Sequence, residues 1–446
     1  MKNKKLILPL TLALILPCIT SCGENRKELV ALAEGTLPTS TTYSSDTKLI
    51  FSEYFEGSGS DDLNRALEIY NFSDETVDLS EYEIYYYTKA GANTIKPTSS
   101  VKLSGTLEAK KTYVIVSDTA TTDLWNKGDA STTIRFRGKQ SLGLAHNGKV
   151  VDVLGNIGKV LDWGKDTTYV RKVDHLNPET LTNDSLSWDS YSWIEYGVDN
   201  MNYLGNVENS VTPEELLLGP QIDNSYFQKD FLKYGDNNVV LGNGGAILST
   251  LSAAVDGDTA KFNHQKNVKL AGQSVALSNY VKSDSVRFEV IDTAESYSGN
   301  IQEYGYVAKE FTGKLLKSAE EIAVVSNVGG KITETYGRMM GFVFVHNAYD
   351  VKGNDYRGKW ICSNFLTTLN GYSEKCNTGD LSDELVYKDV PYASYFNNAF
   401  AYAKKNKLGL FSDDEHKEVD PYWDYSSNSY NGKEIDWSQL DKVAQL

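Results

Sequence analysis

Short apolar stretches that alternate with polar residues fill the chain from residue 47 to about residue 206. A period of two is typical of strands that bury one face. Asn147-Gly148 separates two such runs, and this dipeptide accepts the positive φ angles of a type I′ hairpin turn. No helical period interrupts the stretch, so the pattern predicts an antiparallel β-sandwich. The clearest runs are residues 66–70, 82–87, 113–116 and 133–136.

The second half of the chain shows strands first and helices afterwards. Residues 207–240 are polar and acidic without a clear period, and we expect a connector there. After it, the order of elements predicts a five-stranded barrel with appended helices. The predicted strands lie between Ile247 and about Asp292, at 322–325 and at 340–345. The predicted helices span 306–319, where Ala308, Phe311, Leu315 and Ala319 form one apolar stripe, and 395–407.

The N-terminus carries a targeting pattern. Three lysines precede an apolar run from Leu6 to Pro17, which is typical of a secretory signal and too short to span a bilayer comfortably. Residues 19–22 (ITSC) resemble the lipobox of bacterial lipoproteins. That resemblance implies that residues 1–22 are a lipoprotein signal, that Cys22 is acylated, and that the mature protein is anchored on the extracellular face of the bacterial membrane. The alternative is an ordinary signal peptide that is cut nearby.

Residues 23–46 are rich in Ser, Thr, Glu and Gly, and we expect them to form a flexible tether. The 446 residues carry 44 basic and 60 acidic side chains, and the net charge of −16 excludes a generally basic nucleic-acid coat protein but not a local basic cleft. Four cysteines are too few for a disulfide scaffold, and spacing alone does not establish whether Cys362 and Cys376 pair. The five histidines form no H-x-x-x-H pair, which argues against a helical zinc site.

Several stretches of the predicted sandwich resemble the lamin-tail domain of secreted bacterial proteins. The resemblance covers about residues 47–206 and implies an immunoglobulin-like fold with a binding or positioning role toward an unknown ligand. The abundant tyrosines of this region are compatible with core packing or with a dedicated ligand face. The matching stretches are residues 51–58 (FSEYFEGS), 66–71 (ALEIYN), 77–80 (VDLS), 147–148 (NG), 152–155 (DVLG) and 168–172 (TYVRK).

Four short segments of the second half carry candidate chemistry. Carboxylates supply hard oxygen ligands for a divalent cation, and arginines bind phosphate through two parallel hydrogen bonds. A phosphodiester hydrolase needs both elements and a carboxylate that manages the attacking water. Each segment alone is weak evidence, since Asp-Gly-Asp is a common turn. The segments are 256–259 (DGDT), Arg287, 292–295 (DTAE) and 336–338 (YGR).

Together these segments resemble the staphylococcal-nuclease (thermonuclease) family over about residues 245–415. Residues 303–305 (EYG), 335–338 (TYGR) and 403–412 (AKKNKLGLFS) extend the match, although Thr335 stands where a lysine commonly precedes Tyr-Gly-Arg. The resemblance implies an α+β domain at 241–415 with an OB-fold five-stranded barrel, and Ca²⁺-dependent cleavage of DNA or RNA. The implied roles are Asp258, Asp292 and the Thr293 carbonyl as Ca²⁺ ligands, Arg287 and Arg338 on the phosphate, Glu295 on the attacking water, and Tyr336 and Tyr387 on the substrate.

The chain also departs from the family pattern. The segment from Asn263 to Ser285 is longer than the usual hairpin, and Ala294 replaces the usual proline. Residues 347–388 are lengthened as well, which obscures the tyrosines that flank the nucleotide in the family and leaves Tyr387 matched only by its position before Lys388.

The leading hypothesis is a membrane-anchored extracellular nuclease whose first domain is a spacer or binding module. The alternatives are a lipoprotein whose barrel binds nucleic acid without cleaving it, and an adhesin built on the sandwich. A binding module has no use for a water-activating carboxylate, so Glu295 favours the nuclease. Residues 416–446 form an acidic tail, which we expect to be a solvated terminus.

Overall fold

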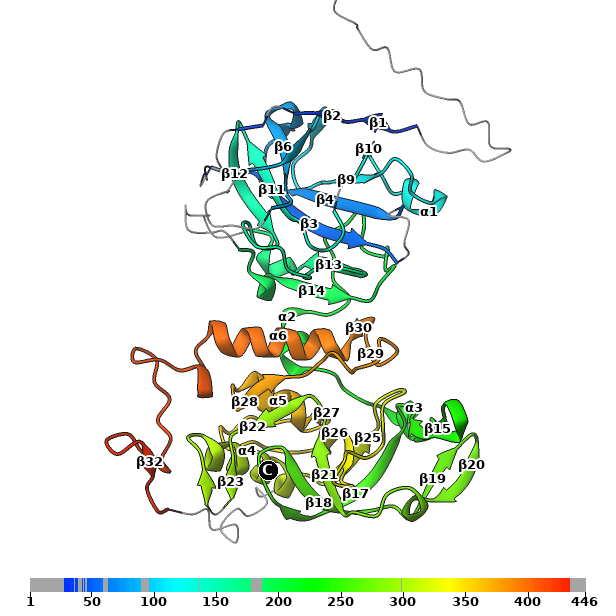
Figure 1. The fold of residues 1–446 in the computed structure, drawn as a ribbon, viewed down its shortest axis with the longest axis vertical. Helices are drawn as coiled ribbons and strands as arrows, with labels where there is room; N and C mark the ends of the chain where they lie inside the picture. Colours follow the sequence, from blue (N-terminus) through cyan, green and yellow to red (C-terminus); the bar gives the residue numbers. More distant parts are fainter. Residues whose placement is uncertain are drawn as a thin grey trace, which may run out of the picture.

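A computed structural model describes residues 28–35, 37–38, 42, 44, 46–58, 63–89, 96–134, 136–177, 187–297 and 299–433. The predicted signal segment and Cys22 lie outside these residues. The described chain forms a β-sandwich and a β-barrel with helices, and helix α6 runs between them (Figure 1). Within the described part of the chain, no helix is long and apolar enough to cross a membrane.

Two sheets pack face to face in the sandwich. Their facing side chains form one apolar core that includes Phe51, Ile69 and Tyr86. The seven-stranded sheet contains, in spatial order, β1 (Val30–Ala31), β10 (Ala130–Thr132), β9 (Thr112–Ser117), β4 (Arg65–Asn71), β3 (Leu49–Glu56), β13 (Thr167–Arg171) and β14 (Trp193–Tyr196). The five-stranded sheet contains β12 (Lys149–Leu154), β11 (Ser141–His146), β6 (Tyr82–Tyr87), β7 (Ser99–Lys102) and β2 (Ala33–Glu34).

The structure confirms most of the strands predicted for this region. The hairpin between β11 and β12 turns at Asn147 and Gly148, which have φ angles of 48° and 81°, as a type I′ turn requires. The strand expected at 133–136 is wrong, because β10 ends at Thr132. Phe136 is buried outside any strand and packs its ring 4.8 Å from that of Tyr54.

The expectation of a tether is also wrong for part of residues 23–46. Val30–Ala31 pairs in parallel with β10, and Ala33–Glu34 pairs antiparallel with β7. A short segment thus adds one strand to the edge of each sheet. Edge strands present unpaired backbone N–H and C=O groups. Residues 30–34 can therefore form strands by backbone hydrogen bonding, although their sequence has little apolar pattern.

The second domain contains a closed barrel of five strands. They are β17 (Ala246–Ala254), β18 (Thr259–His264), β21 (Ser285–Phe288), β25 (Glu321–Val325) and β26 (Met339–His346). Neighbouring strands pair antiparallel except β21 and β26, which pair in parallel and close the barrel. Helix α4 (Gly305–Ser318) connects the third strand to the fourth. Its predicted apolar stripe is confirmed, since Ala308, Phe311 and Leu315 are fully buried.

Residues 207–240 are not a simple connector. Helices α2 (Pro213–Leu218) and α3 (Asn224–Gln228) lie here, and Leu216 and Phe231 belong to the barrel core. Strands β15 (Leu232–Tyr234) and β16 (Val240–Gly242) form a small sheet with β19 (Asn267–Leu270) and β20 (Gln273–Ala276). The prediction failed because the apolar residues of these short elements are too few to show a period.

The remaining elements are short except for the last helix. They are β5 (Val77–Asp78), β8 (Thr106–Leu107), β22 (Ile291–Thr293), β23 (Ser296–Tyr297), β24 (Asn300–Ile301), β27 (Trp360–Cys362), β28 (Ser373–Cys376), β29 (Val386–Tyr387), β30 (Val390–Pro391), β31 (Trp423–Asp424), β32 (Ser429–Tyr430), α1 (Thr122–Trp125), α5 (Ser363–Leu369), α6 (Tyr392–Lys405) and 3₁₀ turns at Leu79–Glu81, Val173–His175, Ser190–Ser192, Asp236–Asn238, Leu277–Asn279 and Gly409–Phe411.

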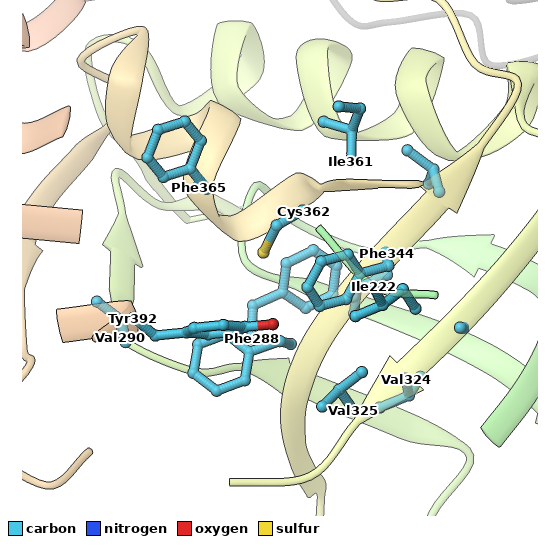
Figure 2. Close-up of a cluster of buried hydrophobic side chains, with 14 of the residues drawn as sticks. Ile222, Phe288, Val290, Val324, Val325, Phe344, Ile361, Cys362, Phe365 and Tyr392 are labelled. Carbon is cyan, nitrogen blue, oxygen red and sulfur yellow. The ribbon is translucent and has the colours of Figure 1, made fainter. Parts of the chain in front are cut away.

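The barrel core extends from the strands to α5 and α6. Figure 2 shows Cys362 among aromatic and branched side chains that include Phe288, Phe344 and Tyr392. Burial raises the pKa of the Cys362 thiol to about 12, so this cysteine is an apolar packing residue. Cys362 and Cys376 are both free thiols, which answers the question of their pairing.

Two carboxylates of the acidic tail are not solvated as expected, although most described residues of the tail are exposed. Asp420 is 1% exposed, and its carboxylate accepts hydrogen bonds from the backbone N–H groups of Tyr304 (2.7 Å) and Tyr422 (2.8 Å). Glu418 accepts hydrogen bonds from the Tyr372 hydroxyl (3.0 Å) and the Gly409 N–H (2.9 Å). These carboxylates satisfy backbone donors that the barrel leaves open, including the one that precedes α4.

We therefore expect Asp420→Ala to destabilise the barrel. The substitution leaves the buried N–H of Tyr304 and the partly buried N–H of Tyr422 unpaired, which costs about 1–3 kcal/mol of unfolding free energy. Urea unfolding of the full chain measures this loss, and the exposed Glu415→Gln is the matched control. Equal stability of the two variants would contradict a structural role for the tail.

Candidate active site

Arg287 joins two carboxylates that come from different strands. The register of β18 and β21 places Thr259 opposite Arg287, so the guanidinium lies beside Asp258 at the start of β18. Nη1 of Arg287 forms an ion pair with Oδ1 of Asp258, and Nη2 lies 2.7 Å from Oδ1 of Asp292. Asp258 is only 3% exposed, so the guanidinium takes the place of the water that would otherwise solvate its carboxylate.

Thr293 links the segment that contains Asp292 to the segment that contains Asp258. Its N–H and its hydroxyl donate to Oδ2 of Asp258 at 2.8 and 3.1 Å. The chain reaches this position through Val290, which has a φ angle of 75°. A β-branched residue rarely adopts positive φ, and such strain persists where surrounding contacts enforce it. The turn between β21 and β22 thus brings Asp292 back toward Arg287.

Lys375 is a site residue that the sequence analysis missed. It lies on β28, opposite Asp292 in the register with β22, and its Nζ is 2.8 Å from Oδ2 of Asp292. Ser373 on the same strand accepts a hydrogen bond from the Asp292 N–H at 3.0 Å. Burial would raise the pKa of Asp292, but hydrogen bonds from Lys375 and Arg287 outweigh it and lower the pKa. The sequence does carry one signal for β28. Gly371 follows the end of α5, and a glycine at that position indicates that a helix has ended and that another element begins.

Glu295 lies at the edge of the same cluster. Its N–H donates to Oε1 of Gln302 at 2.7 Å, and its carbonyl accepts from the Gln302 N–H at 2.9 Å, so its backbone is held in place. Burial and then the negative charges of Asp256 and Asp258 raise the pKa of Glu295. Burial and the charge of Asp258 also raise the pKa of Asp256. The carboxylates are therefore close enough to influence one another's protonation.

Arg338 is linked to the cluster through Thr259. Its Nη1 donates to Oγ1 of Thr259 at 3.4 Å, and that hydroxyl donates to Oδ1 of Asp258 at 3.0 Å. Nε of Arg338 lies 3.1 Å from Oε1 of Glu334, which orients the side chain. Tyr336 is 86% exposed, and its ring centre lies 6.0 Å from Cζ of Arg338. Tyr336 thus lies at the exposed edge of the site, next to Arg338, where its ring is accessible to a substrate.

Tyr387 does not belong to this group, and its assignment is corrected. It lies on β29, its ring packs 6.1 Å from that of Tyr395, and the next residue, Lys388, pairs with Glu215 of α2 at 2.5 Å. The adjoining strand β30 packs against β14 of the sandwich. The lengthened segment 347–388 places this tyrosine near the first domain, a displacement that spacing along the sequence could not reveal.

The donor set has the chemistry of a hard-cation site. Asp258 and Asp292 are brought close enough to contact one guanidinium, and carboxylate oxygens are preferred by Ca²⁺. In the described part of the chain, no three His, Cys, Asp or Glu side chains form a ready metal-ligand group. A cation here would therefore use these two carboxylates with a carbonyl and water, and it would compete with Arg287 for their oxygens.

Comparison with known proteins bears on the first domain. Residues 42–158 match the family model of the Lamin Tail Domain. The chain therefore contains a lamin tail domain, and its sandwich is immunoglobulin-like. The match ends before β13 and β14, which complete the seven-stranded sheet of the lamin tail domain. No curated protein matches the chain.

The two arginines differ in what their removal should do to stability. Arg287→Ala leaves the buried Asp258 carboxylate without its cation, which typically costs 3–5 kcal/mol of unfolding free energy. Arg338→Ala should cost less than about 1 kcal/mol, because its side chain is 32% exposed and pairs with one carboxylate. Urea unfolding of both variants checks the contrast, and a loss for Arg338→Ala as large as that for Arg287→Ala would contradict it.

Proposed function

We propose that the protein is a Ca²⁺-dependent phosphodiesterase that hydrolyses DNA, with RNA as a second candidate substrate. The observation that carries the proposal is the convergence of Asp258, Arg287, Asp292 and Glu295 in one partly open cluster, with Arg338 one hydroxyl away. These residues come from four separate segments of the chain. A purely structural ion pair would not need a second arginine and a nearby carboxylate of raised pKa.

The barrel topology also supports this proposal, because it resembles the topology expected for a thermonuclease-like domain. Its five strands close in the order β17, β18, β21, β26 and β25, and the only parallel pair among them is β21 with β26. Helix α4 lies between the third and fourth strands of the chain order. This arrangement is compatible with an OB-fold, an architecture that binds oligonucleotides on its barrel surface. We therefore assign the second domain to the thermonuclease-like class as part of this proposal.

Each side chain has a role that follows from its surroundings. Arg287 and Arg338 present planar guanidinium groups that suit the non-bridging oxygens of a phosphodiester. Burial and nearby negative charge make Glu295 a better proton acceptor than an ordinary carboxylate, which suits the attack of water. Asp258, Asp292 and the Thr293 carbonyl would hold Ca²⁺, which supplies positive charge for the phosphate when bound.

The lamin tail domain would serve as a spacer or binding module for a ligand that is unknown. It contacts the barrel through α6, where the Glu195 N–H donates to Oγ of Ser394 at 3.1 Å and Lys405 pairs with Asp189 at 2.7 Å. A lipid on Cys22 would then hold both domains at the extracellular face of the membrane.

A non-catalytic nucleic-acid-binding or adhesive lipoprotein remains the second candidate. The observation that favours it is that the Arg287 guanidinium already pairs with two carboxylates, Asp258 and Asp292. These carboxylates would compete with a phosphate for its N–H groups. A protein of this kind would bind DNA in the presence of chelator and leave it intact. Catalysis and binding are therefore separated by the experiments below.

The first test is cation dependence. EGTA should abolish DNA cleavage in a gel zymogram, and Asp258→Ala should do the same in the presence of Ca²⁺, because both remove a ligand–cation contact. The exposed Asp383→Ala is the matched control and should cleave DNA normally. Full cleavage in EGTA would refute the assignment.

The second test separates chemistry from binding. Arg338→Ala and Glu295→Gln should each lower single-turnover cleavage by about 10²–10³, the usual cost of removing a group that acts in the transition state. Nucleotide affinity should fall much less for Glu295→Gln, since this residue acts on water. If neither variant changes turnover by tenfold, the nucleic-acid-binding alternative gains.

The third test concerns the anchor. The wild-type protein should partition into the detergent phase of bacterial extracts, because an acylated Cys22 buries its chains at roughly 0.8 kcal/mol per methylene. Cys22→Ala should move the protein to the aqueous phase or block its processing. Identical partitioning of both proteins would leave only an ordinary signal peptide.

A further inference from the structure

The lamin tail domain contains a second pair of acidic side chains, on the outer face of its seven-stranded sheet. The register of β3 and β4 pairs Phe51 with Ile69 and then Glu53 with Glu68, so Ser52 is the extra residue of a β-bulge. The Ser52 hydroxyl donates to Oε1 of Glu68 at 2.7 Å. The bulge thus gathers Ser52, Glu53 and Glu68 at one point, as bulges near functional sites often do.

This pair is sealed from solvent. Glu53 and Glu68 are both 0% exposed. A small apolar cluster that includes Phe55, Ala66 and Leu204 forms on the same side of the domain. The backbone N–H of Gly205, next to Leu204, donates to Oε2 of Glu68 at 2.6 Å. Both oxygens of Glu68 therefore have a hydrogen-bond donor.

Glu53 has none. Neither carboxylate oxygen of Glu53 has a hydrogen-bond partner among the described residues. Burial, followed by the charge of Glu68, raises the pKa of Glu53, and burial raises the pKa of Glu68 to about 8. The hydrogen bonds from Ser52 and Gly205 lower the pKa of Glu68, and the ammonium of Lys127 lowers both pKa values, but burial outweighs these effects. The carboxylate of Asp129 adds to the rise for Glu68.

Protonation is the competing explanation for this pair. A proton shared between Glu53 and Glu68 would lower the cost of burying them, but it would still leave one oxygen of Glu53 without a hydrogen-bond partner among the described residues. An unpaired buried polar group costs several kcal/mol in either form. The oxygens of Glu53 therefore remain available to a ligand that accepts electron pairs, and the proximity of two carboxyl groups disfavours an anion.

We propose that a divalent cation of the Ca²⁺ class binds between Glu53 and Glu68, beside the Ser52 hydroxyl. Side chains directly opposite on antiparallel strands have Cβ atoms about 4.5–5.5 Å apart, which lets two carboxylates reach one ion at about 2.3–2.6 Å. Ca²⁺ tolerates irregular coordination, whereas Mg²⁺ keeps several waters that a sealed site has little room for. Backbone carbonyls or water would complete the shell.

The position of the site gives the cation a structural consequence. Glu68 holds Gly205, and the same loop carries Asn200 and Tyr203, whose side chains each lie 3.1 Å from Oδ2 of Asp389 in the barrel domain. Bound Ca²⁺ would therefore stabilise the loop that joins the lamin tail domain to the barrel. This inference does not depend on the proposed nuclease activity.

The test counts bound calcium in the full chain. Asp292→Ala removes the candidate cation ligand of the barrel, and equilibrium dialysis of this variant against ⁴⁵Ca²⁺ should still show about one ion per chain. Adding Glu53→Gln should remove that ion, whereas adding the exposed Glu108→Gln should not. The proposal would be overturned if the Asp292→Ala chain bound no Ca²⁺, or if the ion were still bound after Glu53→Gln was added.

A second measurement covers the case in which Glu53→Gln fails to fold. Thermal unfolding of the Asp292→Ala chain should shift to higher temperature in Ca²⁺ and return in EGTA, because a ligand that binds only the folded state stabilises it. No shift would mean that the pair is filled by protons or water and would refute the cation. DNA cleavage by Glu53→Gln in an otherwise unchanged chain should be normal, so failure of this proposal is distinct from failure of the nuclease proposal.

Discussion

The ion pair between Asp258 and Arg287 is the interaction on which the candidate active site depends. Asp258 is almost fully buried, and a buried carboxylate is tolerated only when its charge is compensated. Arg287 compensates it and at the same time holds Asp292, while Thr293 donates two hydrogen bonds to the other oxygen of Asp258. Asp292, Thr293 and, through Thr259, Arg338 are all linked to this pair.

The same arrangement explains how an acidic protein could act on a polyanion. The chain has a net charge of −16, so general electrostatic attraction does not favour nucleic acid. At the site, Arg287, Arg338 and Lys375 lie within one connected set of ion pairs and hydrogen bonds. Local cations of this kind, together with Ca²⁺, would supply the attraction that the surface as a whole does not. Weak non-specific binding and a strong dependence on the cation are the expected consequences.

Sequence reasoning worked where a strong local rule applied. The apolar stripe of α4, most of the period-two strands and the Asn147-Gly148 turn have fixed geometric causes, and the structure contains them. The structure also brings together five of the side chains predicted for the candidate site, from segments around residues 258, 287–295 and 338. Their pairing with one another was not predictable, because it depends on strand register.

The failures have a different physical origin. Lys375 lies in the site because β28 pairs with β22. Tyr387 lies outside it because a lengthened segment places this tyrosine near the sandwich. Asp420 looked like one more solvated acid, although it accepts hydrogen bonds from buried backbone donors. In each case a long-range contact decides the environment of a single residue, and no local period records such a contact.

A double-mutant cycle tests the central claim, that Asp258 and Arg287 form one unit whose carboxylate is shared with a cation site. Unfolding free energies are measured for the wild type, Asp258→Asn, Arg287→Gln and the double variant, in EGTA and in Ca²⁺. We expect a coupling of about 2 kcal/mol in EGTA, and a smaller one in Ca²⁺, because the cation and the guanidinium compete for the same oxygens. A coupling below about 0.5 kcal/mol in EGTA, or one that Ca²⁺ leaves unchanged, would contradict the account.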